Sequence, residues 1–239
     1  MKETNSYKKG LTSGFPICIG YFSVSFAFGI FSIQNGLTVF EAFLISLTNL
    51  TSAGQLAGVP IIAGGGTLLE LAATQLVINS RYALMSISLS QKLGKSVKLF
   101  DRFILAHGNT DEIFAIATSN SKNVGNRYMY GLMTLPIVGW TCGTLLGALA
   151  GDVLPDSVSE ALGVAIYGMF VAIVVPAVKK EKSMLWCVTI ALATSCLFRY
   201  SPYLTHIPSG FAIILCSCIA SAIAAIIFPV ENEVASDEA

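Results

Sequence analysis

The stretch Leu47-Thr48-Asn49-Leu50-Thr51-Ser52-Ala53-Gly54-Gln55-Leu56-Ala57-Gly58-Val59-Pro60 places five polar side chains and two glycines inside sequence that is otherwise apolar enough to lie in lipid. In hydrocarbon, every unpaired backbone or side-chain polar group is costly. Such a run is stable only where protein or a water-filled cavity surrounds it. The stretch is therefore predicted to form a binding site, or one wall of it.

The rest of the chain has the composition of a membrane protein. Of 239 residues, 54% are hydrophobic and 12% are charged, whereas a soluble domain has roughly 25% charged residues. The mean hydropathy is +0.71, and the net charge of +0 provides no basic field for nucleic acid. We expect an all-α, multi-pass bundle in the lipid bilayer of the cytoplasmic membrane, with one transmembrane domain covering residues 1–239.

The cysteines lack the paired spacing of a zinc site or a disulfide framework. All six lie in apolar segments, where they are interpreted as small packing residues: Cys18, Cys142, Cys187, Cys196, Cys216 and Cys218. No metal and no cofactor are expected.

Apolar runs long enough to cross about 30 Å of hydrocarbon predict about seven transmembrane helices. The candidates lie at 13–33, 38–62, 67–91, 128–150, 158–178, 184–199 and 208–229. The second contains the opening stretch and the sixth is barely long enough, so at least one broken helix is expected. An apolar stretch at 103–119 is too interrupted to count as an eighth.

Charge placement leaves the orientation open. With seven spans and an outer N-terminus, the inner loops hold nine Lys and Arg residues against four outside. If 103–119 also crosses, the N-terminus lies inside, and the count becomes eight Lys and Arg residues inside against five outside. Both arrangements place the acidic tail, 231–239, in the cytoplasm.

A faint internal similarity suggests a repeat. Residues 10–20 resemble 131–139, and Glu41-Ala42 begins the second span much as Glu160-Ala161 begins the fifth. With three spans in each unit, 10–91 and 128–199 would form an inverted 3+3 repeat, followed by a last helix at 208–229. Chance similarity between two glycine-rich apolar helices explains the pattern equally well.

Four glycines recur every fourth residue and form one smooth helix face: Gly139, Gly143, Gly147 and Gly151. Such a face lets another backbone approach closely. It predicts helix packing, either within the chain or with another subunit, rather than substrate contact.

The third span carries a polar face and one buried charge. Gln75 and Asn79 share a face that continues to Tyr82, whereas Arg81 points elsewhere. A charge inside a membrane needs a partner. The candidates are a substrate carboxylate or one of three acids, Glu70, Asp111 and Glu112; snorkelling to the surface is the alternative.

The segment 106–114 combines His107 with two acids. Gly108 breaks any helix, and the following residues can cap a new one whose first turn holds Asp111 and Glu112. The acids are interpreted either as capping residues or as a proton carrier and counter-charge to Arg81. A metal site is not expected, because no second histidine lies near and the spacing fits no ligand pattern.

The opening stretch itself offers hydrogen-bonding groups without net charge, which suits a zwitterion. Gly54, Gly58 and Pro60 permit an unwound backbone, whose exposed helix N-terminus can take a carboxylate while oxygens take an ammonium. Interhelical hydrogen bonding is the alternative explanation.

Several motifs in the same order resemble the AzlC family of branched-chain amino acid exporters. They are Phe26-Ala27-Phe28-Gly29, Ser52-Ala53-Gly54-Gln55, Asn79-Ser80-Arg81-Tyr82 and Thr110-Asp111-Glu112-Ile113-Phe114. The family typically has Pro-Phe-Gly at the first and an Arg-His pair at the third, so Ala27-Phe28 and Tyr82 are departures.

The resemblance implies a secondary exporter of branched-chain or similar amino acids, not an enzyme, built from this large subunit and a small AzlD-type membrane subunit. The residues expected to bind substrate are Asn49, Ser52, Gln55, Gln75, Asn79, Arg81 and, for the side chain, Phe28. Asp111 and Glu112 are expected to balance or couple charge. The alternatives are a membrane-embedded hydrolase using His107, Asp111 and Glu112, and a non-transporting scaffold.

Overall fold

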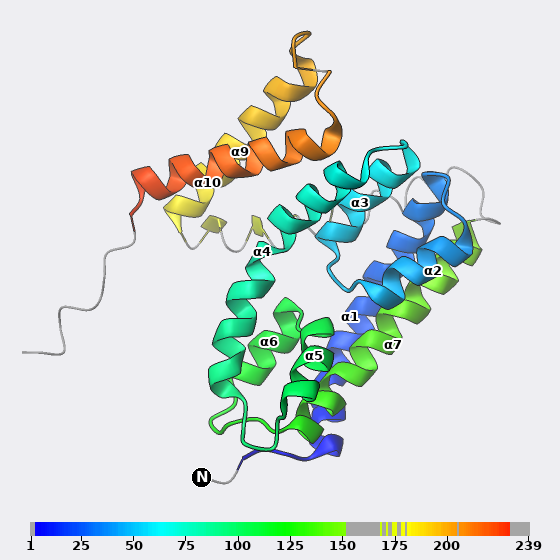
Figure 1. The fold of residues 1–239 in the computed structure, drawn as a ribbon, viewed down its shortest axis with the longest axis vertical. Coiled ribbons are helices and arrows are strands. Elements are labelled where there is room, and N and C mark those ends of the chain that lie inside the picture. Colours follow the sequence, from blue (N-terminus) through cyan, green and yellow to red (C-terminus); the bar gives the residue numbers. More distant parts are fainter. Residues whose placement is uncertain are drawn as a thin grey trace, which may run out of the picture.

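A computed structural model describes residues 3–151, 181–204 and 206–229, together with 168, 171, 174–175 and 178–179. The described chain is a helix bundle, which confirms the predicted fold class (Figure 1). Its helices are α1 (Tyr7–Gln34), α2 (Val39–Thr48), α3 (Ala53–Ala63), α4 (Leu68–Lys92), α5 (Leu99–His107), α6 (Asp111–Thr118), α7 (Asn126–Gly151), α9 (Lys182–Tyr200) and α10 (Ser209–Ile227). The acidic tail and most of the expected span at 158–178 lie outside the described residues.

Four described helices are long and apolar enough to cross a membrane: α1, α7, α9 and α10. They correspond to the predicted spans at 13–33, 128–150, 184–199 and 208–229. Helix α4 corresponds to the span at 67–91. Its 25 residues reach about 37 Å at 1.5 Å per residue, which also suffices to cross.

Helices α1 and α7 form a parallel pair that runs the length of the bundle (Figure 1). Gly139 lies against Cys18, Gly143 against Phe22 and Gly147 against Phe26, a constant offset of 121 residues. The Thr4 amide donates to the Asn123 carbonyl at 2.8 Å just before the two helices. Both helices therefore begin at the same end of the bundle.

The four-glycine face of α7 packs on α1 of the same chain. A Cβ added to Gly147 would lie 1.9 Å from the Phe26 carbonyl oxygen, and one added to Gly139 would lie 2.7 Å from that of Cys18. Because backbone lies against backbone, only glycine fits at these positions.

The segment predicted to span at 38–62 instead forms a re-entrant hairpin, α2–α3. Helix α2 begins where α1 ends, and Val59 of α3 packs against Phe28 and Leu37 near that same end. Helix α4 then runs back across the bundle, to where the Val124 amide donates to the Lys92 carbonyl at 3.0 Å. Helices of 10 and 11 residues are about 15 and 17 Å long, so neither crosses alone.

A second hairpin, α5–α6, enters from the opposite side. At its base the Tyr130 hydroxyl and the Lys98 amide donate to Asp101, which lowers the pKa of that carboxyl. At its other end Asn120 donates to the Tyr128 hydroxyl at 3.2 Å. Both ends lie beside the start of α7, so the stretch at 103–119 does not cross.

The two hairpins are inverted relative to one another. Helix α1 is followed by a hairpin from one face, and the antiparallel α4 is followed by a hairpin from the other. The units predicted at 10–91 and 128–199 begin with α1 and α7, which run parallel, whereas an inverted repeat needs these helices antiparallel. The observed inversion instead relates α1 and α2–α3 to α4 and α5–α6.

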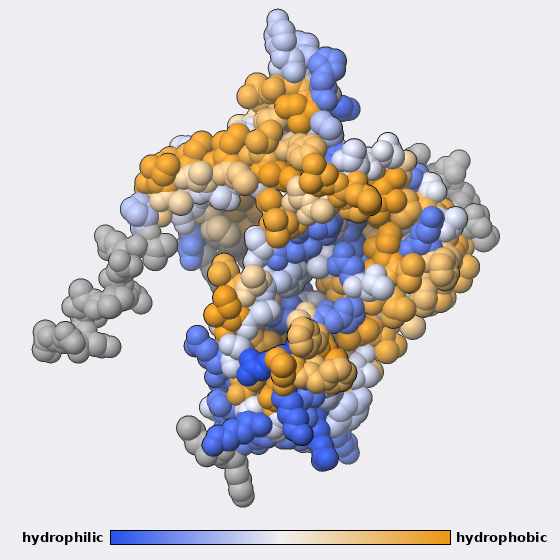
Figure 2. Space-filling model, in the orientation of Figure 1, coloured by the Kyte–Doolittle hydropathy of each residue, from blue (hydrophilic) through white to orange (hydrophobic). Residues whose placement is uncertain are grey.

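Basic residues gather at the end where α1 and α7 begin, here named the basic end. Figure 2 shows hydrophilic surface at this end and apolar surface over much of the remainder. The described Lys and Arg residues there are Lys8, Lys9, Lys92, Lys95, Lys98, Arg102, Lys122 and Arg127. Within residues 3–151 the opposite end carries none, and the only other cation is Arg81, inside the bundle.

Candidate functional site

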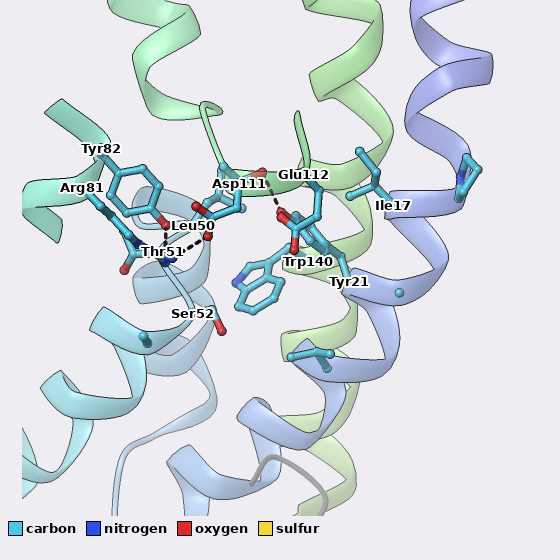
Figure 3. Close-up of a pocket in the computed structure, with 15 residues that line it drawn as sticks. Ile17, Tyr21, Leu50, Thr51, Ser52, Arg81, Tyr82, Asp111, Glu112 and Trp140 are labelled. Atoms are coloured by element: carbon cyan, nitrogen blue, oxygen red, sulfur yellow. Dashed lines mark hydrogen bonds and ion pairs between the residues drawn. The ribbon is translucent and has the colours of Figure 1, made fainter. Parts of the chain in front are cut away.

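The tips of the two hairpins meet at a cavity of about 530 Å³ (Figure 3). The α2–α3 link contributes Leu50 to Ser52, and the start of α6 contributes Asp111 and Glu112. Helices α1, α4 and α7 supply the remaining walls. The cavity combines apolar surface with unlike charges, and its size is typical of a small-molecule site.

Strained backbone and a buried hydrogen-bond network build the first tip. Ser52 has φ +52°, a conformation rare for a residue with a side chain. Gln55, 2% exposed, accepts from the Ser52 amide at 3.3 Å and donates to the Ser46 hydroxyl at 3.0 Å. Ser46 in turn bonds to Thr144 of α7 at 2.7 Å. Side-chain hydrogen bonds from Gln55 and Ser46 therefore hold the non-helical tip against α7.

The polar face of α4 holds the start of α3. Gln75 donates to the Gly54 carbonyl at 2.8 Å, and Asn79 donates to Gln75 at 2.9 Å. A Cβ on Gly54 would lie 2.6 Å from the Gln75 side-chain oxygen, so this close approach requires glycine. These amides position the hairpin beside the cavity.

The structure divides the expected substrate residues between several places. Ser52 and Arg81 line the main cavity. Asn49, Gln55 and Gln75 line a separate cavity of about 160 Å³. Phe28 is 2% exposed and packs in a hydrophobic cluster with Val59 and Leu37.

The second tip is fixed by contacts to three helices. Gly108 packs against Met133 of α7, where an added Cβ would lie 2.3 Å from the terminal methyl carbon. Asn109 donates to Ser86 of α4 at 3.2 Å. The hydroxyl oxygens of Thr110 and Tyr21 of α1 are 2.6 Å apart. Helix α6 therefore begins at the edge of the cavity.

Arg81 and Asp111 form an ion pair across the cavity, with a guanidinium nitrogen 2.5 Å from a carboxylate oxygen. Their side chains are 44% and 47% exposed. Arg81 also donates to the Tyr82 hydroxyl at 3.2 Å and lies 4.9 Å from the centre of that ring. Among the three acids predicted as partners the structure selects Asp111, whereas Glu70 accepts from the Gly210 amide at 2.9 Å.

Glu112 is the remaining charge in the cavity wall. Its carboxylate accepts from the Tyr21 hydroxyl, and the Tyr21 ring packs edge-on against Trp140, with ring centres 5.2 Å apart. Since Arg81 is paired with Asp111, the formal charge of the three ionised groups is −1. The wall therefore favours a ligand with a cationic end.

Two of the aromatic wall residues, Tyr21 and Trp140, carry no signal in the sequence, whereas Tyr82 continues the polar face of Gln75 and Asn79. Aromatic residues are common in apolar helices, and their positions relative to a cavity depend on how the helices pack. Only Tyr82 could therefore have been singled out from the sequence.

His107 does not join the two acids. It ends α5 and lies outside the residues that line the cavity. Among the described residues, no group of three or more His, Cys, Asp or Glu side chains could hold a metal ion. The geometry therefore provides no support for the hydrolase alternative.

Known proteins resemble the chain over most of its length. A membrane protein of Archaeoglobus fulgidus, described as uncharacterized, is 32% identical over 75% of this chain and 79% of its own length. The inner membrane protein YgaZ of Escherichia coli is 28% identical over 78% of each. An uncharacterized membrane protein of Helicobacter pylori is 24% identical over 62% of this chain and 67% of its own. No solved structure matches the chain significantly.

The AzlC protein family matches residues 16–154. This region contains both hairpins, α4, α7 and the larger part of α1, and it includes every residue that lines the main cavity. The chain is a multi-pass membrane protein that belongs to the AzlC family.

Proposed function

We propose that this protein is the large subunit of a two-component secondary transporter that exports branched-chain or similar amino acids. The observation that carries the proposal is the meeting of two opposed hairpin tips at a cavity of about 530 Å³ with charged and apolar walls. Family membership supports amino acid transport as the process.

The hairpins suit transport because each tip separates the cavity from one face of the membrane. Non-helical backbone at membrane depth is stable only inside protein or beside a water-filled cavity, and in transporters it marks the substrate site. A movement of one tip would open the cavity to one side while the other stays closed. The proton-motive force is the proposed energy source, with Asp111 and Glu112 as the candidate coupling acids.

We infer that the basic end faces the cytoplasm. Cytoplasmic loops of membrane proteins carry an excess of Lys and Arg. All eight described cations outside the bundle interior in residues 3–151 lie at this end. The N-terminus and the base of α5–α6 are then cytoplasmic, and α2–α3 opens to the outside.

A small AzlD-type membrane subunit is the proposed partner. Helix α4 exposes large apolar side chains that the described chain leaves uncovered: Leu69 is 73% exposed, Leu76 74% and Leu84 72%. Lipid and such a subunit are both chemically suited to cover this surface.

Counterflow tests the proposal. Vesicles containing the chain and an AzlD-type subunit are loaded with leucine, and entry of labelled leucine is compared with entry of other amino acids. We expect labelled leucine to accumulate, and Asp111→Asn to slow it at least tenfold. Glu41→Gln, which removes a carboxylate at the start of α2 outside the cavity, is the matched control and should have no effect. An assembled complex without counterflow of any amino acid would instead support the scaffold alternative.

A further inference from the structure

Trp140 carries a buried hydrogen-bond donor without an acceptor. Its side chain lines the main cavity, the residue is only 3% exposed, and its indole nitrogen has no hydrogen-bond partner. Buried tryptophan N–H groups ordinarily have a partner, because an unpaired donor is costly. Since Trp140 lines the cavity, a ligand that packs against its ring can supply the missing acceptor.

The indole nitrogen is turned toward the link between α2 and α3 (Figure 3). At this link α3 begins with Ala53, which also lines the cavity. The first amides of a helix have no acceptor within the helix and form the positive end of its dipole. Trp140 and the start of α3 therefore place hydrogen-bond donors around one part of the cavity.

The cavity wall also holds a carboxylate without a cationic partner, Glu112. Glu112 accepts from Tyr21 through one carboxylate oxygen, Oε2, and the other has no partner among the described residues. Arg81 does not neutralise it, because its guanidinium is bonded to Asp111 at 2.5 Å. The cavity wall thus combines hydrogen-bond donors at Trp140 and the start of α3 with a carboxylate at Glu112.

We propose that the cavity binds a zwitterionic α-amino acid in one fixed orientation. The carboxylate of the solute accepts from the Trp140 indole and the first amides of α3, and its ammonium donates to Glu112. The apolar side chain lies against Ile17, Val24 and Leu50 of the wall. Trp140 is a specificity-determining residue in this arrangement, and the orientation rests on the proposed transport function.

The arrangement assigns Arg81 a different role from the one expected of it. The sequence led us to expect that Arg81 attracts the substrate carboxylate. Its pairing with Asp111 makes it a positioning residue that joins α4 to the second hairpin tip. A neutral donor set at Trp140 and α3 accepts a carboxylate without breaking that ion pair.

Three ligands with the same apolar side chain distinguish the role of the Trp140 donor from that of Glu112. Leucine has both charged groups, 3-methylbutylamine lacks the carboxylate, and 4-methylpentanoate lacks the ammonium. Binding of each to the purified complex is measured by calorimetry. Trp140→Phe should weaken the binding of leucine and of 4-methylpentanoate about 10- to 100-fold, as expected for loss of a hydrogen bond to a charged group. It should leave the affinity for the amine unchanged. Glu112→Gln should weaken the binding of leucine and of 3-methylbutylamine but not that of 4-methylpentanoate.

The second tryptophan provides the control and an independent readout. Trp186 lies on α9, 53% exposed and away from the cavity, so Trp186→Phe should change none of the three affinities. That variant leaves Trp140 as the only tryptophan. The ¹⁵N–¹H signal of its indole should shift with leucine and with 4-methylpentanoate but not with the amine, even if Trp140→Phe does not fold.

Two results would overturn the proposal in different ways. If leucine binds but Trp140→Phe weakens all three ligands equally and the indole signal stays fixed, the orientation is wrong and the transport function stands. If neither leucine nor any other amino acid tested in the counterflow panel binds the intact complex, the proposed function fails, and the orientation fails with it.

Discussion

Replacing Gly147 by alanine tests the contact between α1 and α7, on which both hairpins depend. An added Cβ would lie 1.9 Å from the Phe26 carbonyl oxygen and 2.7 Å from its carbonyl carbon. Both atoms are backbone, so no side chain can rotate away. Relief of the clash requires α1 itself to move.

The size of the effect follows from this distance. A carbon and a carbonyl oxygen ordinarily approach to about 3.3 Å, so the helices must separate by about 1.4 Å at this point. Overpacking of a well-packed interior typically costs about 1–3 kcal/mol. For a chain of 239 residues, 1 kcal/mol corresponds to roughly 2–4 °C, so we expect the melting temperature in detergent to fall by roughly 2–12 °C.

Gly151→Ala is the matched control on the same helix face. Its nearest neighbour would be the Ile30 Cα at 3.2 Å, which a shift of a few tenths of an ångström accommodates. Gly151 is the last residue of α7, so alanine gains less helix propensity there than at Gly147. This difference favours Gly147→Ala, so a lower stability of that variant must come from the clash. Thermal denaturation of the two purified variants should show Gly147→Ala clearly less stable. Equal melting temperatures would refute the close parallel packing.

Three further perturbations test the tips. Ser52→Gly removes a side chain from a residue at φ +52° and should stabilise the protein by about 1 kcal/mol in thermal denaturation; a loss of stability would contradict the strain. Gln55→Leu leaves the buried hydrogen-bond partners of a side chain that is 2% exposed without a partner, and should lower the free energy of unfolding by about 2–3 kcal/mol. The control Gln34→Leu, at an exposed position, should not; equal effects would refute the network. In a double-mutant cycle of Arg81→Ala and Asp111→Asn, we expect a coupling of about 1 kcal/mol, because both side chains are nearly half exposed. Additive effects would mean that the pair does not form.

The sequence predicted where the membrane helices lie in the chain better than whether each apolar segment crosses the membrane. Helices α1, α7, α9 and α10 are continuous apolar runs, so hydropathy alone predicts them. Residues 38–62 are equally long and apolar, and their length cannot distinguish a crossing from a hairpin. The direction of α3 is decided by the backbone at Ser52 and by packing of Val59 on Phe28, which hydropathy does not encode.

Charge was the most informative guide to the cavity. Arg81 and Asp111 could be predicted as partners because charges inside a membrane are rare and require compensation. Trp140 could not be predicted, because one tryptophan in an apolar helix has no distinguishing pattern. Gln75 was predicted to bind substrate; in the structure it donates to the Gly54 carbonyl, a hydrogen bond that depends on the fold.

Accessibility of single cysteines tests the two opposed hairpins most directly. With the six native cysteines replaced by alanine, Gln34→Cys and Leu68→Cys flank α2–α3, and Lys95→Cys and Ser121→Cys flank α5–α6. A membrane-impermeant maleimide added to intact cells should label both of the first pair, and should label the second pair only after permeabilisation. If Gln34→Cys and Leu68→Cys are labelled from opposite sides, the segment between them crosses the membrane, and the cavity between two opposed tips does not exist.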